Sequence, residues 1–407
     1  MKYIAIIGYG IVGGGITAVL EENACRIAKN VGEEVAVKYI LDLRDFPDSP
    51  YGDRVVHSID PILADKEVEL VCETMGGSHP AFEYTMSLFA AGKSVVTSNK
   101  EVVATFGDEL LAEAAKNGVQ YLFEASVGGG IPGLRSFRTS LAGDNVTGID
   151  GILNGTTNYI LTRMKESGCS YETALGEAQK LGYAEANPTA DVDGIDAQRK
   201  IIILTALSTG VLADAKDVYA ETMRNITTAD MDAAARLGGA IKLIASARME
   251  GGKAALFVAP RIVPGTCQLA HINDVYNGVS VTTPMLSDIL YYGRGAGRYP
   301  TAAAVVADVC AVLSGAAAKE MIPEFTRAPE KIVPFETLSF RYYLRVETDN
   351  AEQLRAGLEA YADSVTNLEG APAGCAEYVI GRINAKEFME MCSALQITPV
   401  SALRILD

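Results

Sequence analysis

Residues 182–200, GYAEANPTADVDGIDAQRK, place several carboxylates directly ahead of a lysine. Asp196 and Lys200 are four residues apart, so on a helix they share a face and can form an ion pair. The residues after Lys200, IIIL, are apolar, which indicates a helix with little surface in solvent. Charged groups and the hydrophobic core therefore meet at this lysine. The other carboxylates of the stretch are Glu185, Asp191 and Asp193.

A lysine in the wall of a cleft, paired with a carboxylate, suits proton transfer. A buried lysine needs a partner or loses its proton, and it can then exchange a proton with a substrate. We expect Lys200 to donate a proton to a carbonyl oxygen, with Asp196 as its partner. The alternative is an ordinary solvated pair, which would contribute only about 0.2–0.5 kcal/mol. We also expect Asp191 or Asp193 to cap the helix through a side-chain oxygen.

A glycine-rich turn lies near the amino end, between an apolar run at residues 4–7 and a helical pattern. It has the G-x-G-x-x-G form, in which glycines let backbone N–H groups approach a pyrophosphate at the start of the helix. A plain connecting turn would also use glycines, but the position between a strand and a helix favours dinucleotide binding. The expected cofactor-binding residues are Gly8, Gly10, Ile11, Val12 and Gly13.

The end of the second predicted strand, residues 35–43, bears on the choice of nicotinamide cofactor. Asp42 and Asp45 could accept a hydrogen bond from the ribose 2′-hydroxyl of NAD, whereas Arg44 could bind the 2′-phosphate of NADP. Both kinds of residue are present, so the choice stays open.

Three further buried strands are predicted, at residues 68–72, 94–97 and 121–123. Each leads into a polar or glycine-rich loop, and in a doubly wound sheet such loops meet where ligands bind. We expect Thr74 and Met75 of the first loop to lie beside the cofactor ring. Lys100 of the second loop is a site candidate, the alternative being a solvated loop lysine. The third loop, EASVGGGIPG, could direct carbonyl groups at a monovalent or divalent cation, or could be a hinge between domains.

After residue 133 the regular alternation of strands and helices ends, which indicates a second domain. A strand at residues 146–153 leads into NGTTN, whose hydroxyl and N–H groups could hold a substrate carboxylate or simply start a helix. A second glycine-rich turn at residues 292–301 precedes a helix at 302–313, which we expect to pack back against the first domain. The other predicted elements are helices at 171–181 and 229–245 and strands at 254–263 and from 279 onward.

The pattern as a whole predicts an α/β protein of three domains. We expect a Rossmann dinucleotide-binding domain at residues 1–133, an α+β substrate domain at 134–320 and a small α+β domain at 337–407. Residues 321–336 carry three prolines, which predicts a linker. In the last domain the pattern predicts strands at 340–346, 376–380 and 400–406, a helix at 351–362, and a capping box from Asn384 to Glu387.

The composition narrows the class of protein. The 407 residues carry a net charge of −16, which argues against nucleic acid or an anionic membrane surface as a partner. The seven cysteines are scattered without a C-x-x-C pair, as in a protein with reduced thiols, and structural zinc is not expected. No apolar run approaches a membrane span of roughly 20 residues and no signal-peptide pattern is present, so we expect a cytoplasmic protein.

These motifs together resemble homoserine dehydrogenase over residues 1–320. GYGIVG, ETMGG, TSNK, EASVGGGIPG, NGTTNYIL, GIDAQRK and GRGAGRYPTA occur in that family's order and spacing. The resemblance implies reversible, NAD(P)-dependent reduction of L-aspartate 4-semialdehyde to L-homoserine, a step of threonine and methionine biosynthesis. It also implies a dimer formed through the second domain.

The resemblance assigns roles to individual residues. Lys200 resembles the family's proton donor, oriented by Asp196, and Lys100 resembles its lysine near cofactor and substrate. Glu185 resembles the residue that binds the substrate's amino group, and Arg44 favours NADP although the neighbouring aspartates keep NAD open. The remaining substrate-pocket residues are Gly155, Thr156, Tyr183 and Asp191, and Gly297 is a cofactor residue. The implied ligands of a monovalent cation (Na⁺ or K⁺) are the backbone carbonyls of Glu124, Val127, Gly129 and Ile131.

The C-terminal domain is similar to an ACT domain, which implies feedback by an amino-acid effector such as threonine. Its first strand-to-helix turn, TDNAE, lacks the Pro-Gly of that pattern. Two alternative functions have different requirements. A thioester-forming semialdehyde dehydrogenase would need an activated cysteine beside a histidine. A regulator that senses NAD(P) without turnover would not need both Lys100 and Lys200.

Overall fold

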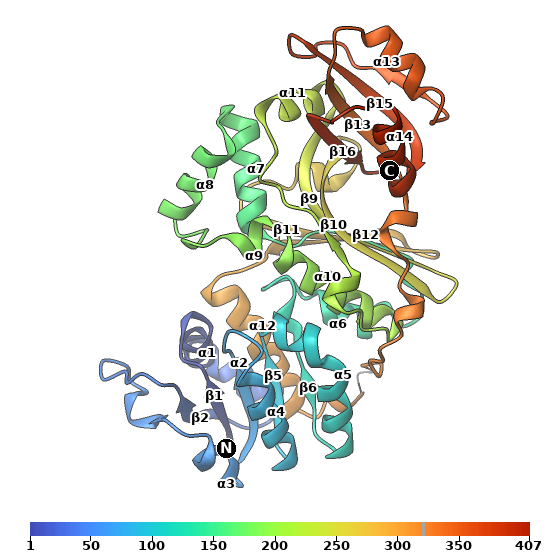
Figure 1. Cartoon of the computed structure of the whole chain (residues 1–407). Helices are drawn as coiled ribbons and strands as arrows, with labels where there is room; N and C mark the ends of the chain where they lie inside the picture. The colour runs from blue at the N-terminus through green and yellow to red at the C-terminus, as the bar shows by residue number, and fades with distance from the viewer. Residues whose placement is uncertain (320–321) are drawn as a thin grey trace.

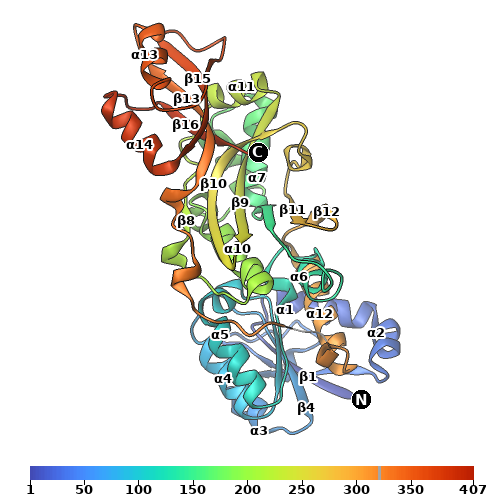
Figure 2. The same cartoon turned by 90° about the vertical axis from the view of Figure 1, so that its right-hand side faces the viewer.

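The computed structural model describes residues 1–319 and 322–407, and two sheets organise it (Figures 1 and 2). A six-stranded sheet occupies the N-terminal end of an elongated molecule. A larger sheet runs through the middle to the C-terminal end. The expected boundary between the second domain and the linker, at residues 320 and 321, lies outside the described residues.

The first sheet is entirely parallel, with strand order β3-β2-β1-β4-β5-β6. Its strands are β1 (Lys2–Ile7), β2 (Val35–Leu41), β3 (Val55–Val56), β4 (Val68–Glu73), β5 (Ser94–Thr97) and β6 (Tyr121–Leu122). Its helices are α1 (Ile11–Glu22), α2 (Ala24–Val31), α3 (Asp60–Ala64), α4 (Ala81–Ala90) and α5 (Lys100–Lys116). The strand order reverses at β1, because β2 and β3 lie on one side of it and β4, β5 and β6 lie on the other. In such a sheet the crevice for a dinucleotide lies at the point of reversal, between β1 and β4. The five strands predicted here are confirmed.

Helix α12 (Arg298–Leu313) returns the chain to this first domain. It lies against α1, and a Cβ at Gly15 would stand 2.7 Å from the Arg298 carbonyl oxygen. Its buried residues Val305 and Val309 share a hydrophobic core with Ile4 and Ile6 of β1. The chain therefore crosses between the domains a second time, as the pattern at residues 302–313 predicted.

The second sheet has the order β12-β11-β7-β9-β10-β16-β13-β15-β14, and β8 also pairs with β10. Its strands are β7 (Gly148–Ile152), β8 (Tyr219–Ala220), β9 (Gly239–Glu250), β10 (Lys253–Pro264), β11 (Tyr276–Thr283), β12 (Ser287–Arg294), β13 (Ser339–Glu347), β14 (Val365–Asn367), β15 (Cys375–Asn384) and β16 (Ser401–Ile405). The accompanying helices are α6 (Gly133–Arg138), α7 (Gly155–Ser167), α8 (Tyr171–Lys180), α9 (Thr189–Val192), α10 (Ile195–Thr209), α11 (Thr228–Arg236), α13 (Ala351–Leu358) and α14 (Ala385–Ala394).

The C-terminal strands continue this sheet instead of forming one of their own. Strand β16 pairs in parallel with β10, through Arg261 with Arg404 and Ile262 with Ile405. This pairing covers an edge of β10 that would otherwise present unpaired backbone groups. The region expected as a separate small domain is thus joined to the second domain by backbone hydrogen bonds.

The helix predicted at residues 229–245 is wrong in its second half. Helix α11 ends at Arg236, Gly238 adopts a φ of +69°, and strand β9 begins at Gly239. The segment is rich in alanine, which favours helix locally, but β9 gains a twelve-residue antiparallel pairing with β10. Helix α13 is also shorter than the predicted 351–362, because it ends at Leu358.

Over the described ranges, the structure has no helix that is both long enough and apolar enough to cross a membrane.

Candidate active site

Helix α10 carries Asp196 and Lys200 into the interior, at the junction of the two sheets. Its first residue follows Gly194, which adopts a φ of +78°, and no side chain caps the helix. The predicted cap by Asp191 or Asp193 is therefore wrong. Asp193 instead pairs with Arg224 at 2.8 Å, and Asp191 accepts a hydrogen bond from Asn154 at 2.7 Å. Both loop carboxylates bind side chains of other elements, so neither accepts a hydrogen bond from the first N–H groups of α10.

Lys200 is buried, with 7% of its surface exposed, and its ammonium has two fixed acceptors. Nζ donates to the carbonyl oxygen of Leu153 at 2.6 Å and to Oδ2 of Asp196 at 2.7 Å. An ammonium has three N–H donors, so one remains for a further acceptor. The geometry thus fixes the direction of this remaining donor.

Asp196 binds two ammonium groups at once. Its Oδ1 lies 2.9 Å from Nζ of Lys100, at the start of α5, and its Oδ2 accepts from Lys200. Asn154, the N-cap of α7, donates to Oδ2 at 2.9 Å and also to Asp191. One carboxylate thereby connects α5 of the first domain, α10, and the start of α7.

Burial and these charges shift the pKa values of the pair. Burial alone would raise the pKa of Asp196, but Lys200 and Lys100 outweigh it and hold that pKa below its ordinary value. Burial lowers the pKa of Lys200 despite the neighbouring Asp196. Burial also raises the pKa of Asp191. A lysine with a lowered pKa exchanges its proton more readily near neutral pH.

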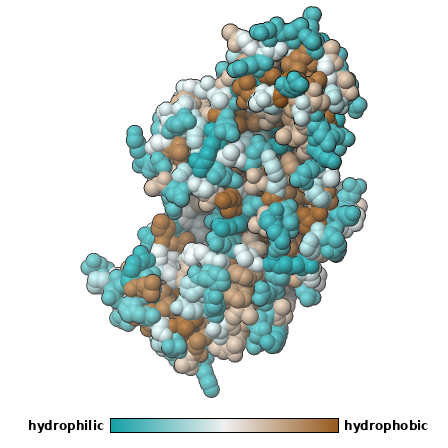
Figure 3. Space-filling view, viewed as in Figure 1, coloured by the Kyte–Doolittle hydropathy of each residue, from teal (hydrophilic) through white to brown (hydrophobic). Residues whose placement is uncertain are grey.

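A cavity of about 540 Å³ opens in front of this pair. The space-filling view shows the molecule hollowed between its N-terminal and middle parts (Figure 3). The cavity brings together predicted site residues from six separate parts of the chain. These are Ile11, Val12, Lys100, Gly129, Gly155, Thr156, Tyr183, Asp191, Asp196, Lys200 and Gly297.

The glycine turn fits a dinucleotide. Around Gly10 a Cβ would meet nothing within 4 Å, so space is open beside the start of α1, which no side chain caps. Gly13 must lack a side chain, because its Cβ would stand 2.1 Å from the carbonyl oxygen of Gly8. Gly8 has a φ of +87° and packs against Thr74, whose hydroxyl donates to the Gly8 carbonyl at 2.7 Å. Uncapped N–H groups beside open space are what a pyrophosphate requires.

Asp42, which follows β2, has its carboxylate oxygens occupied by four hydrogen-bond donors of the protein itself. It accepts from the backbone N–H of Tyr9 at 2.8 Å, and from the backbone N, Nε and Nη2 of Arg44 at 3.0 Å each. Its side chain is 8% exposed, whereas that of Arg44 is 64% exposed. The Arg44 side-chain bond, against the opposing effect of burial, lowers the pKa of Asp42 to about 2.

The loop proposed for a cation is buried between β6 and α6. Gly128 and Gly129 have φ values of +75° and +54°, and the Ile131 N–H donates to the Gly128 carbonyl at 2.9 Å. The Ile131 carbonyl accepts from Gly133 at 2.7 Å, which leaves it one lone pair. Glu124 accepts the Arg135 N–H at 2.7 Å through its side-chain Oε2, while its buried Oε1 has no hydrogen-bond partner. Carbonyl oxygens are suitable ligands for a hard cation.

Some predicted residues do not line the cavity. Glu185 is exposed, and its backbone carbonyl accepts a hydrogen bond from Nε2 of Gln179 at 3.1 Å. Arg44, which follows β2, and Met75, which follows β4, do not line it either. The sequence reasoning missed Asn154 as a site residue, although it opens the NGTTN turn, and it also missed Arg294. The polar residue that opens a turn beside a predicted site was the available signal for Asn154.

The comparisons with known proteins agree with this geometry. Residues 8–124 match the family described as homoserine dehydrogenase, NAD binding domain, and residues 132–310 match the homoserine dehydrogenase family. The homoserine dehydrogenase of Neisseria gonorrhoeae is 38% identical over 353 residues, covering 84% of this chain and 81% of that protein.

Solved structures extend the likeness to the whole chain. A homoserine dehydrogenase from Thiobacillus denitrificans superposes with a TM-score of 0.91 at 32% identity, covering 100% of this chain and 98% of that one. A hyperthermophilic archaeal homoserine dehydrogenase in complex with NADPH has a TM-score of 0.66 at 28% identity, covering 77% of this chain and 98% of that one. With these matches and a lysine–aspartate pair facing the dinucleotide crevice, the chain belongs to the homoserine dehydrogenase family.

Proposed function

We propose that this chain catalyses the reversible, NAD(P)-dependent reduction of L-aspartate 4-semialdehyde to L-homoserine, with Lys200 as the proton donor. The observation that carries the proposal is the placement of the Asp196–Lys200 pair in the same cavity as Ile11 and Val12 of the glycine turn. When bound, the reduced nicotinamide supplies a hydride to the aldehyde carbon.

The protein's own groups then have to manage the charge that develops on the aldehyde oxygen. The remaining N–H of Lys200 stabilises that negative charge and delivers the proton. Asp196 keeps the ammonium in place, and the Leu153 carbonyl fixes its orientation. Lys100, held on the other oxygen of Asp196, adds a second positive charge to the cavity.

The substrate's other groups find partners on α7 and in the loop before α10. Backbone N–H groups at Gly155 and Thr156, at the start of α7, suit its carboxylate. Asp191 lines the cavity and suits its ammonium, and Glu185 is a further candidate, reached only if the exposed loop moves inward. Tyr183, whose carbonyl accepts from the Thr156 hydroxyl at 2.6 Å, closes this side.

The test is an absorbance assay at the reduced-nicotinamide band with homoserine and an oxidised cofactor. Turnover is expected, and cofactor binding without turnover would favour the alternative of a non-catalytic sensor. Alkylation of the thiols should leave the rate unchanged, because no cysteine is among the cavity residues of the described chain and Cys72 is fully buried. Loss of activity on alkylation would favour the thioester mechanism instead.

For the cofactor, we propose a preference for NADP over NAD. A carboxylate offers about four lone-pair positions, and Asp42 already accepts four N–H donors, so it has none left for a ribose 2′-hydroxyl. The exposed edge of Arg44 remains available to a 2′-phosphate. Arg44→Ala should therefore reduce kcat/KM for NADPH but not for NADH, with exposed Arg26→Ala of α2 as the control. An equal effect on both cofactors would contradict the preference.

We propose further that a monovalent cation binds the carbonyl groups of Glu124, Val127, Gly129 and Ile131. The support is a buried loop with two glycines in left-handed conformations beside the cavity. Thermal unfolding in Na⁺, K⁺ and tetramethylammonium should show a higher Tm with one of the small cations. Identical curves at matched ionic strength would argue against the site.

We also propose two features of the larger assembly: a dimer formed through the second domain, and an ACT-like C-terminal region, β13 to β16. The support for the dimer is that exposed apolar residues gather on the β11–β12 hairpin, among them Met285, Leu286 and Tyr292. The C-terminal region has the element order βαββαβ and the strand order β16-β13-β15-β14. Light scattering tests the first proposal. Titration with threonine tests the second, and no change in rate or Tm would count against threonine as the effector.

A further inference from the structure

A second cavity, of about 630 Å³, lies where the second domain meets the C-terminal strands. It shares no lining residue with the first cavity, which Lys200 lines. Its walls come from the ends of β9 and β10 on one side and from β13, β15 and the C-terminal segment on the other. Three of its lining residues are arginines, namely Arg248, Arg261 and Arg382.

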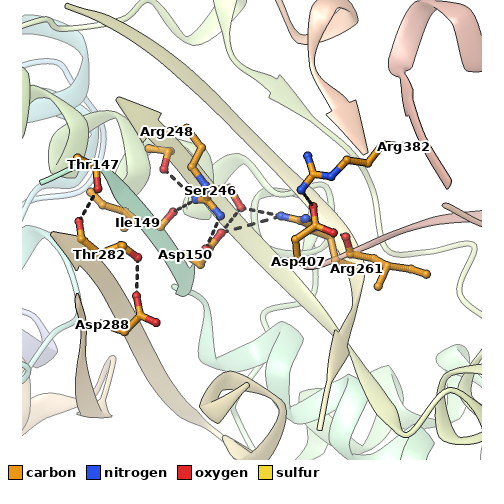
Figure 4. A network of polar contacts seen from close by, with 12 residues as sticks. Thr147, Ile149, Asp150, Ser246, Arg248, Arg261, Thr282, Asp288, Arg382 and Asp407 are labelled. Carbon is orange, nitrogen blue, oxygen red and sulfur yellow. Dashed lines mark hydrogen bonds and ion pairs between the residues drawn. The ribbon is translucent and has the colours of Figure 1, made fainter. Parts of the chain in front are cut away.

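Behind the wall on the second-domain side lies a polar stripe that crosses three strands, and Figure 4 shows its side chains converging. Of this stripe, Arg248 and Arg261 line the cavity. Asp150 of β7 accepts from the Ser246 hydroxyl at 2.6 Å and from Nη2 of Arg248 at 2.7 Å. Arg261 of β10 donates through Nη1 to the same Ser246 oxygen at 3.1 Å. One carboxylate therefore serves two guanidinium groups.

Arg261 is the least compensated charge of this stripe. It is 3% exposed, its nearest carboxylate oxygen on Asp150 is 3.9 Å away, and its buried Nε has no hydrogen-bond partner. Burial lowers the pKa of Arg261 to about 10, which still leaves it charged at neutral pH. A buried charge without a close counter-ion is costly, so an anion in the adjoining cavity would be stabilised.

The opposite wall presents Arg382 through an irregularity in the sheet. Between the pairs Phe340–Ile383 and Tyr342–Ile380, one residue of β13 faces two of β15, Gly381 and Arg382. Such a bulge redirects a side chain, and the Arg382 side chain is 60% exposed and held by Asp407 at 2.5 Å. Guanidinium groups thus line both sides of the cavity.

The rest of the lining combines apolar side chains, from Phe257, Phe340, Leu338, Met249 and Ala255, with the hydroxyl residues Thr147 and Ser339 and the carboxylates Glu250 and Asp407. The Arg261 guanidinium lies over the rings of Phe257 at 5.4 Å and Phe340 at 5.8 Å, so charge and apolar surface are adjacent. We infer that this cavity binds a small carboxylate with a hydrocarbon body, its oxygens between Arg248 and Arg382 above Arg261. Such a ligand would bridge the second domain and the C-terminal strands.

The experiment is calorimetric titration of the full chain with hexanoate and, separately, with inorganic phosphate at constant ionic strength. Hexanoate should bind, and Arg248→Gln and Arg382→Gln should each weaken it about ten- to hundred-fold, because each removes a charged hydrogen bond. Both side chains are about half exposed, so both variants should fold. Arg355→Gln is the matched control, because Arg355 is an exposed arginine of α13 paired with Glu359 outside the cavity.

Four results would overturn the inference. No heat from hexanoate at millimolar concentration, or equal affinity in all variants, would show that the cavity is not the site; equal affinity would assign the ligand elsewhere, such as the first cavity. Binding of phosphate alone would show that the ligand class is wrong. If hexanoate does not bind, and the protein has the mass of a dimer that Arg248→Gln and Arg382→Gln each dissociate, a second copy of the chain fills the cavity.

Discussion

At the scale of single residues, Asp196 determines what Lys200 can do. Its two oxygens are divided between Lys100 at 2.9 Å and Lys200 at 2.7 Å, and Asn154 adds a third donor. The carboxylate stays charged because two ammonium groups lie against it. Lys200 consequently has a fixed orientation and a pKa lowered by burial, and these are the two properties needed for transfer of a proton to a carbonyl oxygen.

Removal of the Lys200 amine should abolish proton donation and leave the cofactor crevice intact. Lys200→Ala is expected to lower kcat by about 10²–10⁴-fold with little change in cofactor affinity. Asp196 keeps Lys100 and Asn154 as partners, so the fold should survive. Steady-state kinetics and cofactor titration measure the two quantities, with exposed Lys180→Ala as the control. Near-normal turnover would assign the proton to another group.

The pH dependence should differ between the two directions of the reaction. Reduction of the aldehyde needs Lys200 as an ammonium, so its kcat should fall as pH rises through the Lys200 pKa. Oxidation of homoserine needs the neutral amine, so its kcat should rise over the same interval. Because burial lowers this pKa, the interval lies below the ordinary pKa of lysine. Rates in both directions that move together with pH would rule out Lys200 as the titrating group.

At the scale of secondary structure, local patterns predicted the first domain well and the second less well. Strand β1 is fully buried at residues 4–7 and is followed by Gly8 and Gly10, so its apolar run had one interpretation. Strand β9 was misassigned because its alanines and Ile241 to Met249 suit a helix as well as a strand buried on both faces. Partner strand β10 decides between the two, and local sequence does not contain that pairing. The cavity residues were found because they follow strand ends or open helices, and Asp196 because it lies one helical turn before Lys200. The Leu153 carbonyl as second acceptor of Lys200, and the ion pair of Lys100 with Asp196, depend on tertiary packing.

The end of β4 carries a buried acid whose ionisation should affect stability. Burial raises the pKa of Glu73 to about 7, although Thr97 and the Met75 N–H donate to it at 2.6 Å and 2.7 Å. The pKa of Glu73 in the folded protein exceeds the unfolded value of 4.5. Its contribution to the stability of the fold is therefore fully present below pH 4.5 and is lost as pH rises through 7. The loss is at most about 3 kcal/mol. Glu73→Gln should lose less stability than the wild type between about pH 5 and pH 8.

Chemical denaturation at each pH measures this difference, and Glu69→Gln is the matched control on the same strand. Glu69 is exposed and pairs with Lys2 at 2.9 Å, so its substitution should leave the pH dependence unchanged. If the stability of Glu73→Gln changed with pH as that of the wild type does, Glu73 would be ionised in the folded protein at neutral pH.

At the scale of the whole molecule, two long-range connections hold the parts together. Helix α12 returns to the first domain after the second has been built, and β16 adds the C-terminal strands to β10. The pattern of residues 302–313 predicted the first connection because the helix is apolar on the face that meets α1. The second was not predicted, because Arg261 and Arg404 are far apart in the chain and neither flanking sequence specifies the other as its partner.

A buried ionic network makes a third connection, between α11 and the C-terminal strands. Arg345 of β13, 3% exposed, lies 3.0 Å from Asp230 of α11 and 3.7 Å from Glu377 of β15. Arg236, near the end of α11, also bonds to Glu377 and donates to the Gly370 carbonyl at 2.8 Å. Glu377 therefore holds two arginines from two parts of the molecule, and Tyr343 donates to it at 2.7 Å.

Glu377→Ala should release the C-terminal strands from α11, because it leaves Arg345 buried with one carboxylate fewer. Loss of one partner from a buried pair destabilises a protein by about 3–5 kcal/mol. Hydrogen exchange should accelerate in β13 and β15 while α10 keeps its protection, so turnover should change little. Glu359→Ala, which breaks only the exposed pair with Arg355, is the control. If exchange rose equally in α10, the C-terminal strands and the catalytic helix would unfold as one cooperative unit, and the network would stabilise the whole chain and not the junction alone.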